Sequence, residues 1–198
     1  MSYAIYSRMK VARDYRETAI GALKQLKEIQ LANGATGVRQ GILMTGSGVN
    51  LFMKIQFYEN MAALENGWEA SRKSPIINQT LASGKFEFTG RSILRDLVLI
   101  GTPSLDQKYV VLTNGKAESP VEDEVKELGN IFLENGGISG RLLKFVMGDQ
   151  ADGQTYSFGM GYPSLSSVQS AYDAIPAEFA AKFYKLVSVQ RRQIIRLF

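Results

Sequence analysis

Cysteine and histidine are both absent from this 198-residue chain. Without cysteine there is no disulfide scaffold, no thiolate nucleophile and no thiolate metal ligand. Without histidine there is no Ser-His-Asp triad and no histidine-ligated haem. Any catalytic site in this chain therefore has to rely on tyrosine, lysine, arginine and asparagine, with a substrate that supplies part of the reactivity.

Long hydrophobic runs are absent as well. No apolar run approaches the roughly 20 residues that span a bilayer, and the first ten residues alternate polar and apolar side chains, unlike a signal peptide. Apolar residues make up 45% of the chain and charged residues 21%, which is ordinary for a folded domain. We therefore expect a soluble, cytoplasmic protein with no membrane partner.

A strong charge of either sign is also lacking, because the formal net charge is only +4. The excess lies in the first half, where basic residues are spread out and only Arg72 and Lys73 are adjacent. The second half carries a small net negative charge. Such a distribution is typical of a solvated surface, so we expect no nucleic-acid partner.

The two halves of the chain repeat each other. Five features occur in the same order in both: an Asn-Gly pair that ends a helical pattern, an N-cap, an aromatic residue, a proline and an Arg-x-Ile-x-Arg stretch. In residue numbers these are Asn33-Gly34, Asn60, Trp68, Pro75 and Arg91–Arg95, against Asn135-Gly136, Ser164, Tyr172, Pro176 and Arg192–Arg196. We interpret this order as an internal duplication.

Each half has the order strand-helix-strand-strand-helix-strand, which is the ferredoxin-like order. The expected strands are residues 3–9, 38–44, 51–58 and 85–94 in the first half, and 109–113, 141–147, 155–162 and 185–195 in the second. We predict an α+β fold of two ferredoxin-like repeats whose antiparallel sheets pack face to face. The repeats are residues 1–99 and 108–198, and residues 100–107 form the linker.

The third strand of each half has two unlike faces. Odd positions over 51–58 are all apolar and suit packing under helices, whereas the even positions are mixed: Phe52, Lys54, Gln56 and Tyr58. In the second half the even positions form an apolar, aromatic row: Tyr156, Phe158, Met160 and Tyr162. Such a row is too hydrophobic for water, so we predict that the even positions face the space between the sheets. The small residues Ser157, Gly159 and Gly161 leave the inverse assignment open in the second half.

Two such halves packed sheet to sheet resemble the dimeric α+β-barrel superfamily, with the usual dimer fused into one chain. The resemblance covers the whole chain in topology, and the nearest groups are NIPSNAP-like and EthD-like proteins. It implies a cleft between the sheets and a function among small-molecule monooxygenases, isomerases or haem-handling enzymes. The haem branches generally use a histidine, so for this chain we expect no cofactor and no metal. The resemblance also makes a homodimer plausible.

Polar and tyrosine side chains on the predicted interior rows are the candidate ligand-binding residues. Lys54 and Gln56 come first, because a buried lysine needs a partner or a lowered pKa and can be catalytic. The alternative is that Lys54 lies near a barrel mouth and reaches solvent. Tyr156 belongs to the same set, as do Tyr58 and Tyr162, for which we favour a structural role over a bond to a ligand.

Three further residues have two interpretations each. Arg39 and Arg141 occupy equivalent positions, where a guanidinium could clamp an anion, but we favour a salt bridge to an acidic neighbour in each half. Trp68 is the only tryptophan. Because it aligns with Tyr172, we favour a core anchor over a residue that stacks on a ligand.

These observations favour a small-molecule-binding protein with its site between the sheets, either a cofactor-independent monooxygenase or isomerase, or a binder without turnover. The alternative is a non-catalytic structural or interaction module with a filled barrel. RNA binding is a third hypothesis, because Tyr156 and Phe158 have the spacing of a base-stacking strand. A cavity of roughly 300 Å³ between the sheets would favour the first, and a closed space the second.

Overall fold

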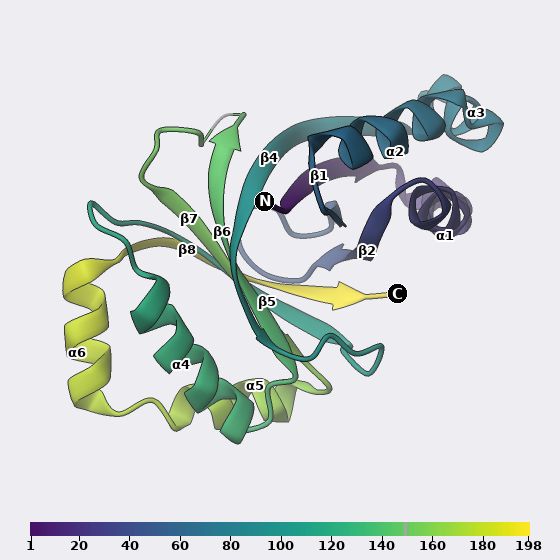
Figure 1. Cartoon of the computed structure of the whole chain (residues 1–198). Helices are drawn as coiled ribbons and strands as arrows, with labels where there is room; N and C mark the ends of the chain where they lie inside the picture. The colour runs from purple at the N-terminus through teal and green to yellow at the C-terminus, as the bar shows by residue number, and fades with distance from the viewer. Residues whose placement is uncertain (149) are drawn as a thin grey trace.

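Eight antiparallel strands form a single closed barrel in the computed structural model, which describes residues 1–148 and 150–198 (Figure 1). The strands are β1 (Tyr3–Val11), β2 (Ala35–Leu43), β3 (Phe52–Tyr58), β4 (Phe86–Gly101), β5 (Tyr109–Lys116), β6 (Ser139–Met147), β7 (Thr155–Tyr162) and β8 (Ser188–Leu197). The helices are η1 (Arg13–Tyr15), α1 (Arg16–Ala32), α2 (Met61–Lys73), α3 (Pro75–Ala82), α4 (Glu122–Glu134), α5 (Leu165–Asp173) and α6 (Ala177–Leu186). Of the helices in the described residues, none is long and apolar enough to cross a membrane.

Each half contributes four strands in the ferredoxin-like order. The first half pairs as β4-β1-β3-β2 and the second as β8-β5-β7-β6. The two sheets then join at their edges, because β4 pairs with β6 and β2 pairs with β8. The first of these seams contains eight residue pairs and the second three. The predicted α+β fold of two ferredoxin-like halves is confirmed, and the barrel is closed by hydrogen-bonded edges.

Local signals placed several element ends correctly. Gly34 and Gly136 both have a φ of 99°, so each adopts the left-handed conformation that ends its helix. The side chains of Asn60 and Ser164 accept the backbone N–H three residues on, as expected of N-caps. Helices α3 and α6 were not predicted, and α6 occupies the start of the strand expected from residue 185.

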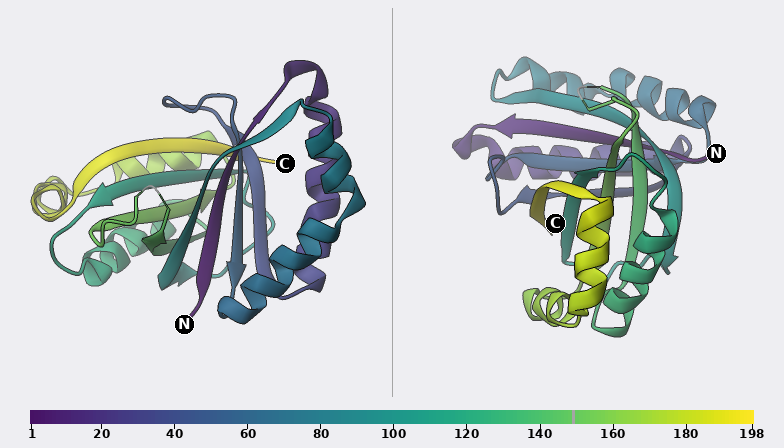
Figure 2. Two further views of the ribbon diagram at one scale, coloured as in Figure 1. Left: turned by 90° about the horizontal axis from the view of Figure 1, so that it is seen from above. Right: turned by 90° about the vertical axis from the view of Figure 1, so that its left-hand side faces the viewer.

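The helices form two layers on opposite sides of the barrel. Helices α1, α2 and α3 cover the outer face of the first sheet, and α4, α5 and α6 cover that of the second (Figures 1 and 2). The barrel interior is built by both halves from Ala4, Tyr6, Leu43, Met53, Ile55, Leu94, Val110, Leu112, Leu143, Phe145 and Ile195. Each sheet is therefore buried on both faces, and the molecule has four layers.

The predicted facing of the third strands is wrong in both halves. The odd positions of β3, including Met53 and Ile55, lie in the barrel interior. The even positions lie under the helices: Phe52 packs with α1, and Phe158 packs with α4. Alternation shows that two faces differ, but when both faces are buried it does not show which one meets the helices.

The predicted linker, residues 100–107, overlaps the end of a strand in the structure. Strand β4 continues to Gly101, two residues beyond the predicted end of the first repeat, and β5 begins at Tyr109. The division into repeats at 1–99 and 108–198 stays a prediction.

Candidate ligand site

The space between the two sheets is nearly filled. Two cavities lie inside the barrel, about 130 Å³ at one end and about 40 Å³ at the other. Both are well below the roughly 300–1,000 Å³ of typical ligand pockets. The prediction that Lys54, Gln56 and the tyrosines line a site between the sheets is therefore wrong in its location.

A larger cavity of about 550 Å³ lies outside the barrel, between the first sheet and helices α1, α2 and α3. We call it the first-half cavity. Its lining residues are Ile5, Leu26, Gln30, Lys54, Gln56, Trp68, Ser71, Arg72, Ile77, Asn78, Leu81, Phe88 and Arg91. The cavity thus contains both of the polar candidates from β3, and its walls are otherwise mainly apolar.

A row of polar side chains crosses the sheet beneath this cavity. Register pairing aligns Gln40 of β2, Lys54 of β3, Ser7 of β1 and Arg91 of β4 as neighbours. Cross-strand neighbours point to the same face of a sheet. Because Tyr6 points into the barrel, Ser7 and its row point toward the helices.

Lys54 is the most unusual member of this row. Only 2% of it is exposed, and within the described residues its ammonium group has no hydrogen bond and no ion pair. Burial, together with the positive charge of Arg91, lowers the pKa of Lys54 to about 7. Lys54 neither reaches solvent at a barrel mouth, as the alternative predicted, nor has a protein partner.

Within the part of the chain that the structure describes, Arg91 has no acidic partner. Its Nε donates to Ser7 Oγ at 3.3 Å, and its guanidinium lies 5.0 Å from the ring centroid of Trp68 and 4.6 Å from that of Phe88. Burial lowers the pKa of Arg91 as well. The lining residues include no carboxylate, so the site carries positive charge that the protein does not neutralise locally.

Two amide side chains add polar groups to the walls. Ser71 Oγ donates to the Gly67 carbonyl at 2.6 Å and so accepts from Gln30 Nε2 at 3.0 Å. This chain of bonds fixes the orientation of the Gln30 amide. Its oxygen Oε1 is left buried, with no partner in the described part of the chain. On β3, Gln56 Oε1 accepts from Tyr58 at 2.8 Å.

The two aligned tyrosines pack in the core and do not line the first-half cavity. Tyr58 is fully buried against Gly67 of α2, where a Cβ would come within 2.7 Å of its ring. Burial raises the pKa of Tyr58 to about 12. Tyr162 is equally buried, packs edge-on against Phe132, and burial raises its pKa further. This placement agrees with the structural role that we favoured.

Trp68 is not the core anchor predicted from its alignment with Tyr172. It is 39% exposed and lies at the rim of the first-half cavity, near Leu81, which is also partly exposed. Its ring covers the Arg91 guanidinium on the side of α2. The only tryptophan of the chain is therefore a reporter placed beside the site.

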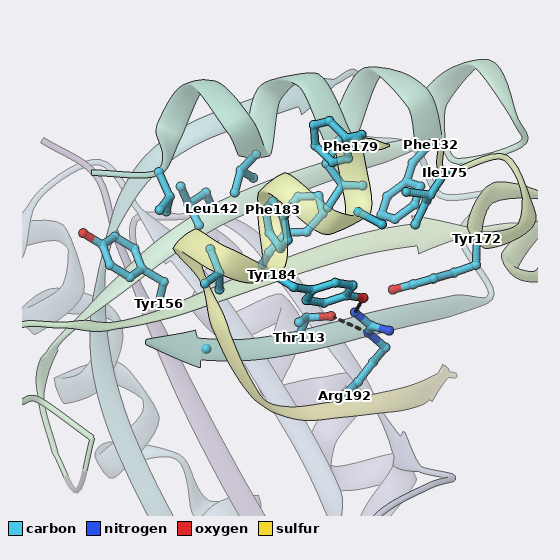
Figure 3. Close-up of a pocket in the computed structure, with 17 residues that line it drawn as sticks. Thr113, Phe132, Leu142, Tyr156, Tyr172, Ile175, Phe179, Phe183, Tyr184 and Arg192 are labelled. Atoms are coloured by element: carbon cyan, nitrogen blue, oxygen red, sulfur yellow. Dashed lines mark hydrogen bonds between the residues drawn. The ribbon is translucent and has the colours of Figure 1, made fainter. Parts of the chain in front are cut away.

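The corresponding space in the second half is filled (Figure 3). It has a volume of only about 40 Å³, and Tyr156 and Phe158 line it with aromatic residues from α4 and α6. The equivalents of Gln30, Lys54 and Gln56 are Phe132, Phe158 and Met160. Tyr156, predicted to bind a ligand between the sheets, lies instead in this packed layer.

The equivalent of Arg91 keeps the same contacts. Arg192 Nε donates to Thr113 Oγ1 at 3.3 Å, and its guanidinium lies 4.9 Å from the ring centroid of Tyr172. Figure 3 shows Arg192 at the edge of the filled space, where it also donates to Tyr184. The two layers thus share the arginine with its hydroxyl and aromatic partners, and they differ in the side chains that occupy the space beside it.

The position of Tyr156 and Phe158 contradicts the RNA hypothesis. Both are about 7% exposed and lie under the helix layer. Base stacking needs aromatic rings on an open sheet face, and this face is covered.

Arg39 and Arg141 lie together at one end of the barrel, where both line the 130 Å³ cavity. Arg141 forms an ion pair with Asp96, as predicted. Arg39 instead donates to Gln107 Oε1 at 3.4 Å and to the Ser104 carbonyl at 3.3 Å. The salt-bridge prediction is therefore confirmed for Arg141 and wrong for Arg39, whose pKa is lowered by burial and by the charge of Arg141.

Sequence reasoning missed Gln30, Ser71 and Arg91 as parts of this site. A signal was present for Gln30, because it continues the buried helical spacing of Leu23 and Leu26 with a polar side chain. Its equivalent in the second half is Phe132, so comparing the two halves position by position would have found it.

Comparisons with known proteins support the architecture. A family described as a domain of unknown function (DUF6854) matches residues 2–96, which is slightly less than half of the chain. No curated protein matches the sequence. The match covers the half that contains the cavity.

Solved structures match over the whole chain at low sequence identity. A candidate monooxygenase of Fusobacterium nucleatum has 11% identity and a TM-score of 0.70, covering 99% of this chain and 92% of its own. One of Lactobacillus acidophilus has 12% identity and a TM-score of 0.70, covering 100% and 93%. A variant chlorite dismutase of Candidatus Nitrospira defluvii has 9% identity and a TM-score of 0.59, covering 100% and 91%. The chain therefore shares the α+β-barrel fold of these proteins, with both halves of the barrel in one polypeptide.

Proposed function

We propose that the first-half cavity binds a small organic molecule with a carbonyl or carboxylate oxygen, and that the chain is an isomerase or cofactor-independent monooxygenase acting on it. The observation that carries this proposal is Lys54, a buried cation beside a 550 Å³ cavity with no protein partner among the described residues. An unpaired buried polar group costs stability. A ligand oxygen would offset that cost.

The walls favour a ligand with an apolar body and one anionic or strongly polar oxygen. Ile77, Leu81 and Phe88 supply apolar surface, and Trp68 supplies an aromatic face at the rim. The charged lining residues are all basic: Lys54, Arg72 and Arg91.

The two reaction classes share a first step that the cavity could perform. Isomerisation and cofactor-independent oxygenation of a carbonyl compound both begin with loss of a proton from carbon next to the carbonyl. With a pKa of about 7, Lys54 is neutral in about half of the molecules at pH 7 and can accept that proton. Arg91 then stabilises the oxygen on which negative charge develops.

Binding can be tested with benzoate and phenylpyruvate as anionic probes and benzyl alcohol as the neutral one, followed by Trp68 fluorescence and calorimetry. We expect saturable binding of the anions and at least a tenfold loss of affinity in Lys54→Met and Arg91→Met. Arg192→Met, the equivalent change in the filled layer, is the matched control and should bind like wild type. Equal affinity in all four proteins would overturn the proposal.

Turnover requires a separate measurement. Exchange of the methylene protons of phenylpyruvate for deuterium, followed by NMR, reports proton abstraction directly. We expect exchange above the buffer rate in wild type and at the buffer rate in Lys54→Met. Binding without exchange would favour a binding protein over an enzyme.

The second candidate is a non-catalytic structural or interaction module. The nearly filled barrel interior favours it, since the two cavities there leave room for little more than water. Under this candidate none of the three probes binds, and Lys54→Met changes stability alone.

Three finer assignments stay proposals: kinship with NIPSNAP-like or EthD-like proteins and a homodimer, which rest on the resemblance, and a cytoplasmic location, which rests on the composition. Sedimentation equilibrium of the full chain tests the second, with a mass of 21.9 kDa for a monomer.

A further inference from the structure

We propose that Lys54 is a nucleophile that forms an imine with small aldehydes and ketones entering the first-half cavity. The inference rests on the proposed function, because it uses the same cavity, and it names the substrate class as carbonyl compounds. It adds an attack on carbon, made by the same neutral amine, to the proton removal proposed above.

The step is balanced without an oxidant or a cofactor. The neutral amine of Lys54 adds to the carbonyl carbon, and a proton moves from nitrogen to oxygen to give a carbinolamine. The C–O bond then breaks and the oxygen leaves as water, while the nitrogen forms a double bond to the same carbon. One carbonyl compound and one lysine give one imine and one water.

Nucleophilic lysines are neutral at working pH because they are desolvated or lie beside another cation. Lys54 meets both conditions, since it is buried and its row contains Arg91. Burial, with the charge of Arg91, lowers the pKa of Lys54 to about 7. The free base is therefore abundant at neutral pH.

Among the described residues that line the cavity, none is acidic. Arg91 on β4 and Arg72 on α2 are the other charged lining residues, and both disfavour a third positive charge. The lining residues of α1 and α3 are uncharged: Leu26, Gln30, Ile77, Asn78 and Leu81. The row itself adds Ser7 and Gln40, which are uncharged as well.

Access and selectivity follow from burial. Lys54 is the only lysine that is buried in the described residues, yet it lines a cavity large enough for a small aromatic aldehyde. An aldehyde that carries a carboxylate should also be drawn toward Arg91.

The test is reductive trapping in the full chain. The protein is incubated at pH 7 with 4-carboxybenzaldehyde and sodium cyanoborohydride, which reduces the imine to a stable secondary amine, and the modified lysines are located by peptide mass spectrometry. We expect one adduct, on Lys54, formed at least tenfold faster than on any surface lysine. Benzoate should slow this labelling by competing for the cavity.

Two variants serve as controls. Lys54→Arg keeps the positive charge but forms no imine under these conditions, so fast labelling should disappear. Lys24→Arg removes an exposed lysine and should leave the labelling of Lys54 unchanged. The position of the adduct in the unmodified protein decides the question even where Lys54→Arg does not fold.

The outcomes separate the two proposals. Adducts spread over surface lysines, with benzoate binding intact, would overturn the imine and leave the proposed function standing. If Lys54 is not labelled and benzoate does not bind, both proposals are overturned. The pH dependence adds a second criterion: labelling should increase as pH rises through 7, because the attacking form is the neutral amine.

Discussion

The two helix–sheet layers of this molecule have the same arrangement of elements, but one contains a cavity and the other is tightly packed. In both, an arginine on the last strand donates to a hydroxyl side chain and lies over an aromatic ring on a helix. In the first layer the neighbouring positions are Gln30, Lys54 and Gln56 around a cavity. In the second, bulky apolar side chains take those positions and leave almost no space.

The difference shows how much packing the protein gives up to keep a cavity. The filled layer gains the packing that a core normally provides, whereas the open layer keeps a cavity and a buried lysine without a partner. Functional sites are commonly the places where a fold departs from its most stable filling. The contrast between the layers can therefore be tested by exchanging residues between them.

The largest effect is expected when the filled layer is given a residue of the open one. Phe132→Gln removes a ring that packs against Phe158, Tyr162 and Tyr172. It also buries an amide, so we expect the free energy of unfolding to fall by about 3–5 kcal/mol. Urea denaturation measures it. A loss below about 1 kcal/mol would mean that the second layer is not tightly packed.

Replacing the buried lysine of the open layer with an apolar residue should stabilise the protein. Lys54→Met removes a buried cation whose pKa is lowered to about 7 from the ordinary 10.5. Between these values the unfolded chain binds more protons than the folded one, so wild-type stability rises with pH. We expect Lys54→Met to gain roughly 3–5 kcal/mol at pH 6, and a smaller amount at pH 9.

The control for this change is Lys24→Met, at an exposed position. Its effect on the free energy of unfolding should be small and equal at pH 6 and pH 9. A gain for Lys54→Met that is also equal at the two pH values would show that Lys54 keeps its proton in the folded state.

The equivalent arginines at the barrel end should differ by a smaller amount. Asp96 has a side chain only 6% exposed and relies on Arg141, so Arg141→Met leaves a buried carboxylate unpaired and should cost about 2–4 kcal/mol. Arg39→Met loses three long hydrogen bonds and should cost less than about 1 kcal/mol. Thermal unfolding at pH 8 compares them. Equal losses would mean that Asp96 finds another partner.

The smallest difference is expected for the arginines shared by the two layers. Arg91→Met removes one bond to a hydroxyl group and contacts with two rings, whereas Arg192→Met removes two bonds to hydroxyl groups and a contact with one ring. Each change should cost about 1 kcal/mol. Unfolding of the two variants in parallel tests this equality. A difference above about 2 kcal/mol would show that the two equivalent arginines contribute unequally to the free energy of unfolding.

Most of the fold could be predicted, because its signals are local. The Asn-Gly pairs and the N-caps Asn60 and Ser164 report backbone conformations that neighbouring residues determine. Their repetition in the same order predicted the strand order of each half. Helices α3 and α6 were missed, since each is a short segment without a longer periodic pattern. Helix α3 begins at Pro75, and α6 directly follows Pro176.

The candidate site could be predicted only in part. Lys54 and Gln56 stand out as polar residues in a strand that is otherwise apolar. Their location could not be derived, because both faces of the sheet are buried and either could have met the helices. Arg91 belongs to a strand far along the chain, and only the register of β4 on β1 brings it near Lys54.

The unequal seams of the barrel have a dynamic consequence. The β4–β6 seam holds eight residue pairs and the Arg141–Asp96 ion pair, whereas the β2–β8 seam holds three residue pairs. Thermal opening of the ring should therefore begin between β2 and β8, with the β4–β6 seam as the hinge. The amide proton of Met44, which donates to the Ile194 carbonyl across this seam, should then exchange with solvent sooner than those along β6. In this motion β2 separates transiently from β8, while the pairing of β4 with β6 keeps the two halves of the barrel in register.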